Sequence, residues 1–261
     1  MRVLVIGGTR FIGPHVVRRL RELGAEVTVL HRTNCGDASH IHADRSQASG
    51  EWDAIVDMFA MTEGDARAIT NARGRVVVAS SADVYQQYDR VRGVAQGPTE
   101  SPLHEDSPLR EKLFPYGGDY EKILVERVIA ERGGTILRLP AVYGQGDQRM
   151  REWIGGIVSM SAPQSRWRWT RGYVENVADA IALATIDRRA AGKIYNVGES
   201  DAPMESEWVR MLGGRMNIVA ESPLPFDWRY ELVTDTSAIR RDLGYAERVS
   251  REEAIARTIG G

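Results

Sequence analysis

The sequence predicts an α/β fold, with a doubly wound parallel sheet in residues 1–145 and a smaller lobe in residues 146–261. An unbroken apolar run, Val3–Ile6, is typical of a strand buried on both faces of a parallel sheet. A glycine-rich turn then leads into a helical pattern, and further apolar strands alternate with helical patterns along the chain. After residue 145 the chain can still cross back and contribute to the first region.

Residues 2–30 predict a strand, a helix and a second strand. The helical pattern is carried by apolar residues at helical spacing, namely Ile12, Val16, Val17, Leu20 and Leu23. Gly24 can end this helix, and residues 26–30 then form the second strand. A unit of about thirty residues is the size expected of a dinucleotide-binding unit.

The glycine-rich turn is the predicted phosphate site. Glycine lets the backbone approach a pyrophosphate, and a helix beginning near Ile12 points free N–H groups and its positive dipole end at the anion. The alternative is a simple strand-to-helix turn without a ligand. The residues predicted to contact the dinucleotide here are Gly7, Thr9, Arg10, Phe11, Ile12 and Gly13.

The composition is that of a globular protein. The 261 residues are 43% hydrophobic, and no apolar stretch approaches the ~18 to 20 residues that span a bilayer. A net charge of −2 makes nucleic acid an unexpected partner. The chain opens on a core strand and has one cysteine, Cys35, expected in a loop, so we expect a cytoplasmic protein. No metal site is predicted.

The residues after the second and third strands indicate the choice of cofactor. A carboxylate after the second strand suits the ribose of NAD, whereas Arg32, helped by Arg10, suits the 2′-phosphate of NADP. We therefore expect NADP to be preferred and NAD to be possible, unless Arg32 is a solvated loop residue. In the pair Asp44-Arg45, Asp44 either accepts from an adenine amine or caps the next segment. Residues 52–60 are the predicted fourth strand, the loop after it is expected to run beside the cofactor, and Phe59 is a predicted cofactor contact.

Paired hydroxyls follow the fifth predicted strand. Residues 63–72 suit a helix, and residues 75–79 form a buried strand that runs into Ser80 and Ser81. The carboxyl end of a central parallel strand is where open α/β sheets bind ligands. Ser81 is therefore a candidate for contact with a reacting group.

Several segments, in the same order along the chain, resemble the extended and atypical short-chain dehydrogenase/reductases, the NAD-dependent epimerase/dehydratase family. The matching segments are residues 5–13, 80–85, 137–144, 172–183 and 193–198. This resemblance implies a Rossmann-type fold with a C-terminal substrate lobe. It also implies that Ser81 is the catalytic serine, that Pro140 lies in the segment closing over the nicotinamide, and that Tyr85 contacts the substrate.

Two departures from the family pattern bear on mechanism. Arg10 replaces the middle glycine, as in a Gly-Gly-Thr-Arg-Phe-Ile-Gly subgroup of which some members bind nucleic acid. The family's Tyr-x-x-x-Lys pair is also altered, because Lys122 fits the lysine while the tyrosine position holds Gly118. In the family the lysine binds the nicotinamide ribose and lowers the tyrosine pKa.

Two tyrosines and one carboxylate are candidates to replace the missing tyrosine. We favour Tyr116, which precedes the glycine pair where the helix is expected to begin. Tyr120 is two residues from Lys122 and is expected to point away from it on a helix, whereas Asp119 would share its face. Packing or surface positions are the alternative for both tyrosines.

The substrate side is predicted from a long loop and an alternating segment. Residues 86–115 read as a loop over the site, residues 150–160 as a helix, and residues 232–245 as a capped helix ended by Gly244. Residues 166–171 alternate cations and aromatics, which on a strand would put Arg166 and Arg168 on one face. The family resemblance implies that this segment lies near the nucleotide part of the substrate, where arginine would clamp a diphosphate. A half-buried strand with its arginines in solvent is the alternative. Arg171 ends this segment.

The sequence thus predicts an NADP-preferring oxidoreductase or epimerase acting on a nucleotide-linked sugar or a similar hydroxyl or carbonyl compound. Ser81, Tyr116 and Lys122 are its predicted catalytic residues. A dinucleotide-binding protein without hydride chemistry, redox-sensing or RNA-associated, is the alternative. A third possibility is an epimerase that keeps and regenerates bound NAD. The family resemblance also raises a homodimer through the helix over residues 119–132.

Overall fold

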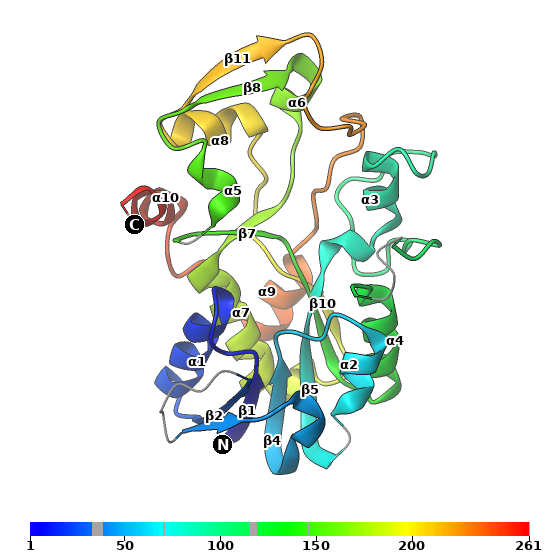
Figure 1. The fold of residues 1–261 in the computed structure, drawn as a ribbon, viewed down its shortest axis with the longest axis vertical. Helices are drawn as coiled ribbons and strands as arrows, with labels where there is room; N and C mark the ends of the chain where they lie inside the picture. The colour runs from blue at the N-terminus through cyan, green and yellow to red at the C-terminus, as the bar shows by residue number, and fades with distance from the viewer. Residues whose placement is uncertain (33–38, 70, 115–118, 146, 261) are drawn as a thin grey trace.

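A seven-stranded parallel sheet lies at the centre of the computed structural model, which describes residues 1–32, 39–69, 71–114, 119–145 and 147–260 (Figure 1). The strand order is β3-β2-β1-β4-β5-β6-β10. The strands are β1 Arg2–Ile6, β2 Glu26–His31, β3 His40–His42, β4 Ser49–Asp57, β5 Asn71–Ser81, β6 Thr135–Leu139 and β10 Ile194–Asn196. The order reverses between β1 and β4, which confirms the predicted doubly wound, Rossmann-type sheet.

Helices cover both faces of this sheet (Figure 1). One face carries α1 (Ile12–Glu22), α7 (Val174–Ile186) and α9 (Ser237–Leu243), and the other carries α2 (Glu63–Ala68) and α4 (Lys122–Glu131). Side chains of β1 alternate between the two layers: Val3 packs with the α1 and α7 side, and Leu4 packs on the opposite side. Burial on both faces explains the unbroken apolar run at the start of the chain.

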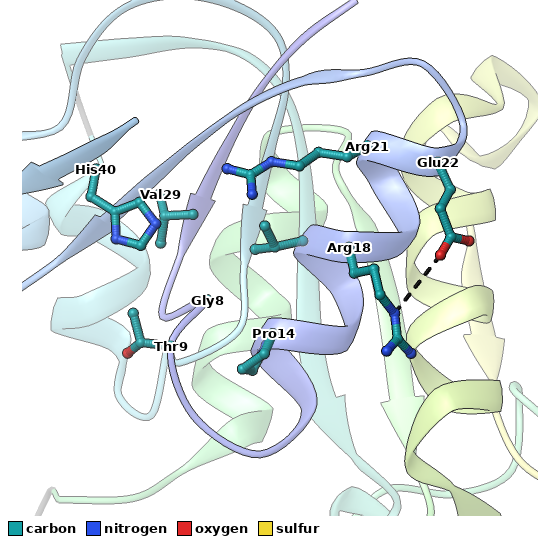
Figure 2. A pocket seen from close by; sticks show the side chains of 9 residues that line it. Gly8, Thr9, Pro14, Arg18, Arg21, Glu22, Val29 and His40 are labelled. Carbon is teal, nitrogen blue, oxygen red and sulfur yellow. Dashed lines mark ion pairs between the residues drawn. The ribbon is translucent and has the colours of Figure 1, made fainter. Parts of the chain in front are cut away.

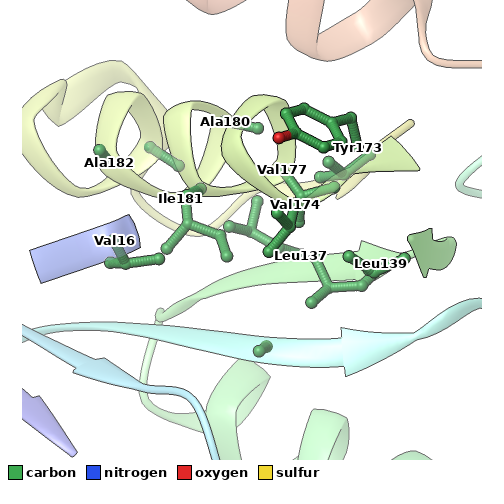
Figure 3. Packing of buried hydrophobic residues seen from close by; sticks show 14 of the residues in the cluster. Val16, Leu137, Leu139, Tyr173, Val174, Val177, Ala180, Ile181 and Ala182 are labelled. Carbon is green, nitrogen blue, oxygen red and sulfur yellow. The ribbon is translucent and has the colours of Figure 1, made fainter. Parts of the chain in front are cut away.

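Packing of α7 shows why the C-terminal part of the chain returns to the sheet. Val174, Val177 and Ile181 point from α7 toward the sheet and α1, and Leu137 of β6 lies beneath them (Figure 3). Beyond residue 145 the chain therefore supplies α7, α9 and β10 to the central layers, and β10 pairs with β6.

A smaller lobe stands above the carboxyl end of the sheet (Figure 1). It contains the parallel pair β8 (Ile157–Ser161) and β11 (Arg215–Val219), with α5 (Gln148–Arg151), α6 (Ala162–Arg166) and α8 (Glu205–Met211). The pair β7 (Ala141–Tyr143) and β9 (Arg171–Tyr173) connects the lobe to the sheet. The remaining helices are α3 (Gln86–Val91), α10 (Arg251–Ile259) and the short turns η1 (Arg45–Gln47), η2 (Ala82–Val84) and η3 (Arg188–Ala190). Within the described ranges, no helix has the length and apolar character needed to cross a membrane.

Four predicted elements are wrong in type or extent. The loop predicted over residues 86–115 begins with the helix α3, Gln86–Val91. The helix over residues 150–160 is replaced by α5, a turn and β8, because Gly155 adopts a φ of +66° and a Cβ on Gly156 would lie 2.2 Å from the Glu152 carbonyl oxygen. The helix from Glu63 ends at Ala68, since β5 begins at Asn71. Residues 166–171 do not form a continuous strand, because Arg166 ends α6. The predicted stop at Gly244 is confirmed by its left-handed φ of +70°.

Candidate active site

The glycine-rich turn brings β1, α1 and the β4 loop into close contact. Gly7 has a φ of +85°, and a Cβ there would lie 3.1 Å from the Phe59 Cβ. A Cβ on Gly13 would lie 2.6 Å from the Gly8 carbonyl carbon. Glycine is thus required both for the turn and for the close approach of the helix to the strand.

The first turn of α1 is suited to an anion. Its N-cap residue is Phe11, which has a φ of +46° and a side chain that cannot accept a hydrogen bond from the helix. Ile12, Gly13, Pro14 and His15 follow, so no carboxylate in this described turn competes for the positive end of the helix. Thr9 and Arg10 are exposed beside it.

A cavity of about 530 Å³ lies beside this turn, between α1 and the strands β2 and β3. Figure 2 shows Arg21 extending from α1 toward Val29 and His40, with Gly8 and Thr9 at the turn. The side chain of Arg21 donates to Ser39 Oγ at 3.1 Å.

Asp44 and Arg45 both have partners within the chain. Asp44 Oδ1 accepts from Ser46 N at 3.0 Å, so Asp44 caps η1, which was one of its two predicted roles. This hydrogen bond is the main cause that lowers the pKa of Asp44. Arg32 is exposed nearby, and its charge lowers the pKa of Asp44 further.

Arg45 fixes the loop after β4. Its guanidinium lies 2.8 Å from Asp57 Oδ2 and donates to the Phe59 carbonyl oxygen at 2.6 Å. Burial raises the pKa of Asp57, and the charge of Arg45 opposes that shift. Asp57 was not predicted as a site residue, although a carboxylate at the end of a central strand was a usable signal. The Phe59 side chain is 51% exposed at this edge.

Ser81 and Lys122 come together at the carboxyl ends of β4 and β5. Ser81 ends β5, and its Oγ accepts from Asp83 N at 3.3 Å. Lys122 begins α4 and is 4% exposed, and its Nζ donates to the carbonyl oxygens of Ala60 at 2.7 Å and Ala79 at 2.9 Å. Burial lowers the pKa of Lys122 to about 8. The adjacent Ser80 donates instead to the buried Glu126.

Tyr120 lies at this site, and the prediction that it points away from Lys122 is wrong. The helix begins at Lys122, so residues 119–121 are not helical and the face argument does not apply to Tyr120 or Asp119. The Tyr120 hydroxyl donates to Asp83 Oδ2 at 2.6 Å, and the Lys122 Nζ lies 5.9 Å from the Tyr120 ring centre. Tyr116 and Cys35 lie outside the described residues.

The predicted substrate contacts divide into buried and exposed side chains. Tyr85 is fully buried, and its hydroxyl donates to Asn196 Oδ1 at 2.6 Å, so in this structure it has no surface for a substrate. Arg171 is buried as well, 2.8 Å from Glu205 and stacked on Trp208. Arg166 and Arg168 are exposed, and Pro140 is half-buried before β7.

This sheet, with a glycine-rich turn at its switch point and polar side chains at the ends of β4 and β5, defines a Rossmann-type α/β protein. Residues 3–72 match the model of the NAD dependent epimerase/dehydratase family. The predicted resemblance to this family is thereby confirmed over residues 3–72. A search of curated proteins found no match.

Several solved structures share the fold. MoeE5 in complex with UDP-glucuronic acid and NAD is 22% identical with a TM-score of 0.73, and UDP-glucose 4-epimerase of Thermus thermophilus in complex with NAD is 19% identical with a TM-score of 0.70. UDP-glucuronic acid 4-epimerase from Bacillus cereus, in complex with UDP-glucuronic acid and NAD, is 15% identical with a TM-score of 0.73. Each alignment covers 100% of this chain and 98% of the other.

Proposed function

We propose that this protein is an NAD(P)-dependent oxidoreductase or epimerase acting on a nucleotide-linked sugar or a similar hydroxyl or carbonyl compound. The observation that carries the proposal is the convergence of Ser81 and Lys122 at the strand ends beside the glycine-rich turn. Lys122 donates to the Ala79 carbonyl, two residues before Ser81, so both side chains belong to one site.

The residues present fit a nicotinamide dinucleotide. Gly13 leaves no room for a Cβ and Gly7 adopts a positive φ that favours glycine, as in a cradle for a pyrophosphate, and the uncapped α1 N-terminus faces the same turn. Lys122 uses two N–H groups on described carbonyls, and its third can bind a ribose hydroxyl. When bound, the nicotinamide accepts or supplies the hydride. Ser81 would then hold the reacting oxygen of the substrate.

NADP is the proposed preference, with NAD possible. The exposed guanidiniums of Arg32 and Arg10 suit a 2′-phosphate, and β2 ends in His31 rather than a carboxylate. In this proposal Asp44 and Arg45 shape the adenine side through η1 and the β4 loop, while Phe59 and Pro140 border the cofactor.

A nucleotide-linked sugar is the proposed substrate class. Its diphosphate would meet the exposed Arg166 and Arg168, while the buried Arg171 and Tyr85 act through their neighbours. The structural neighbours whose complexes hold UDP-sugars support this class. Tyr116 stays a prediction as acid/base, and so do the cytoplasmic location, the lack of a nucleic-acid partner and the homodimer.

The test is the absorbance change of NADPH and NADH against a panel of sugar nucleotides and small carbonyl compounds. We expect turnover by the wild-type protein and a loss of about 100-fold or more in Lys122→Ala. If neither the wild type nor Lys122→Ala changes the absorbance, while each still binds NADPH and NADH, the non-catalytic alternative is favoured instead.

A further inference from the structure

Tyr120 and Asp83 form a hydrogen-bonded pair beside Ser81 and Lys122. The Tyr120 hydroxyl donates to Asp83 Oδ2 at 2.6 Å, and the Ser81 side chain interacts with both residues. The other carboxylate oxygen, Asp83 Oδ1, is buried and has no hydrogen-bond partner among the described residues. A buried acceptor without a donor raises the proton affinity of the ionised carboxylate, which suits a group that is to take a proton.

The fold fixes the two halves of this pair through one buried arginine. The Arg110 side chain is 0% exposed; its Nε donates to the Asp83 carbonyl oxygen at 2.6 Å and its Nη2 lies 2.8 Å from Glu121 Oε1. Glu121 is the N-cap of α4 and follows Tyr120 directly. Arg110 therefore ties the Asp83 segment to the start of α4, and the pair is held from both sides.

We propose, on the basis of the proposed function, that Tyr120 and Asp83, rather than the predicted Tyr116, replace the missing family tyrosine as a two-residue proton relay. The Tyr120 oxygen contacts the substrate hydroxyl and takes its proton, while the Tyr120 proton passes to Asp83 Oδ2. The substrate O–H bond breaks, its carbon gives a hydride to the oxidised nicotinamide, and a C=O bond forms. The reverse reaction returns the proton by the same route. Tyr120 is the catalytic residue, and Asp83 acts through it.

The charges around Tyr120 and Asp83 agree with the Asp83 carboxylate as the final acceptor of the proton. Burial and the Asp83 carboxylate raise the pKa of Tyr120, so Tyr120 stays protonated near neutral pH and can take a proton only as its own proton passes to Asp83. Burial raises the pKa of Asp83, which brings this carboxyl closer to neutral pH. Arg110, Lys122 and the Tyr120 hydroxyl face Asp83 and oppose that shift, and Tyr88 also faces Tyr120.

Two isosteric substitutions test the relay. Tyr120→Phe removes the proton-transferring oxygen, and Asp83→Asn keeps an acceptor for the Tyr120 hydroxyl but cannot take its proton. We expect each to lower kcat by about 100-fold or more against the sugar-nucleotide panel, with the Kd for NADPH within about twofold of wild type. Tyr230→Phe, which removes a hydroxyl bonded to Gly97 O on another segment, is the matched control and keeps wild-type kcat.

A measurement on the wild-type protein covers the case in which a variant does not fold. Carbon-13 NMR of labelled aspartate in the ligand-free protein follows the Asp83 carboxyl, which we expect to titrate above free aspartate. The heat of ionisation of the group that limits kcat should be small, as for a carboxyl, rather than large, as for an ammonium or phenol.

The outcomes separate the relay from the proposed function. An active wild type with an equally active Asp83→Asn or Tyr120→Phe overturns the relay alone, and so does a large heat of ionisation. A wild type that binds dinucleotide but converts no member of the panel overturns the proposed function, and the relay with it.

Discussion

The two ends of the candidate site differ in how closely they follow the family pattern. At the proposed dinucleotide end, Gly7 keeps the positive φ of the turn and Gly13 keeps the close backbone approach of the helix, both of which a pyrophosphate site requires. At the proposed proton-transfer end, Lys122 fits the family lysine but the tyrosine position holds Gly118, and Tyr120 is a described hydroxyl-bearing residue beside Lys122. The two ends lie on different elements, so one can change while the other keeps its geometry.

Removing Arg110 should have the largest effect, and the contacts that it removes lie at the proposed proton-transfer end. Arg110→Met leaves Glu121 buried without its cation, so we expect a loss of about 3 to 5 kcal/mol in the free energy of unfolding. Denaturant unfolding measures this, with Arg67→Ala as the exposed control, for which less than about 0.5 kcal/mol is expected. A loss as small as that of the control would show that Arg110 does not hold the pair.

Lys122 should give the protein a pH-dependent stability. Its pKa is lowered from 10.5 to about 8 in the folded protein, so between these values the unfolded chain binds a proton that the folded chain does not. Stability contributed by this group therefore rises as pH increases from 8 to 10.5, by at most about 3 kcal/mol. Unfolding of wild type and Lys122→Met across this range isolates the effect, and parallel pH curves would contradict it.

A side chain on Gly13 should damage the dinucleotide end without affecting the Asp83 carboxyl. Gly13→Val places a Cβ 2.6 Å from the Gly8 carbonyl carbon, so we expect about 10- to 100-fold weaker binding of NADPH. The control is Gly64→Ala, whose Cβ would lie 3.7 Å from Thr62 Oγ1, an ordinary contact. An unchanged affinity of Gly13→Val for NADPH would mean that the turn does not bind the phosphates.

The smallest effect should be on the choice of dinucleotide. Arg32→Ala removes an exposed guanidinium, so the preference for NADPH over NADH should fall by about tenfold, while NADH affinity stays the same. Fluorescence titration of both reduced dinucleotides checks this. An equal loss of affinity for NADPH and NADH would mean that Arg32 attracts both dinucleotides by its charge and does not bind the 2′-phosphate.

The sequence predicted the sheet well because both faces of its strands are buried and their apolar runs are unbroken, as in Val3–Ile6. It failed at residues 150–160, where two glycines override a helical pattern. It also missed the pair at the site, since Tyr120 and Asp83 meet only through the fold and the helix was expected to begin before Lys122. An acid two residues after Ser81 was the available signal for Asp83.

Calorimetric titration of the wild-type protein with NADPH and NADH tests the central claim, that the turn from Gly7 to Gly13 binds a dinucleotide. We predict saturable binding of one dinucleotide per chain, tighter for NADPH. Heats that do not saturate with either dinucleotide would contradict the account.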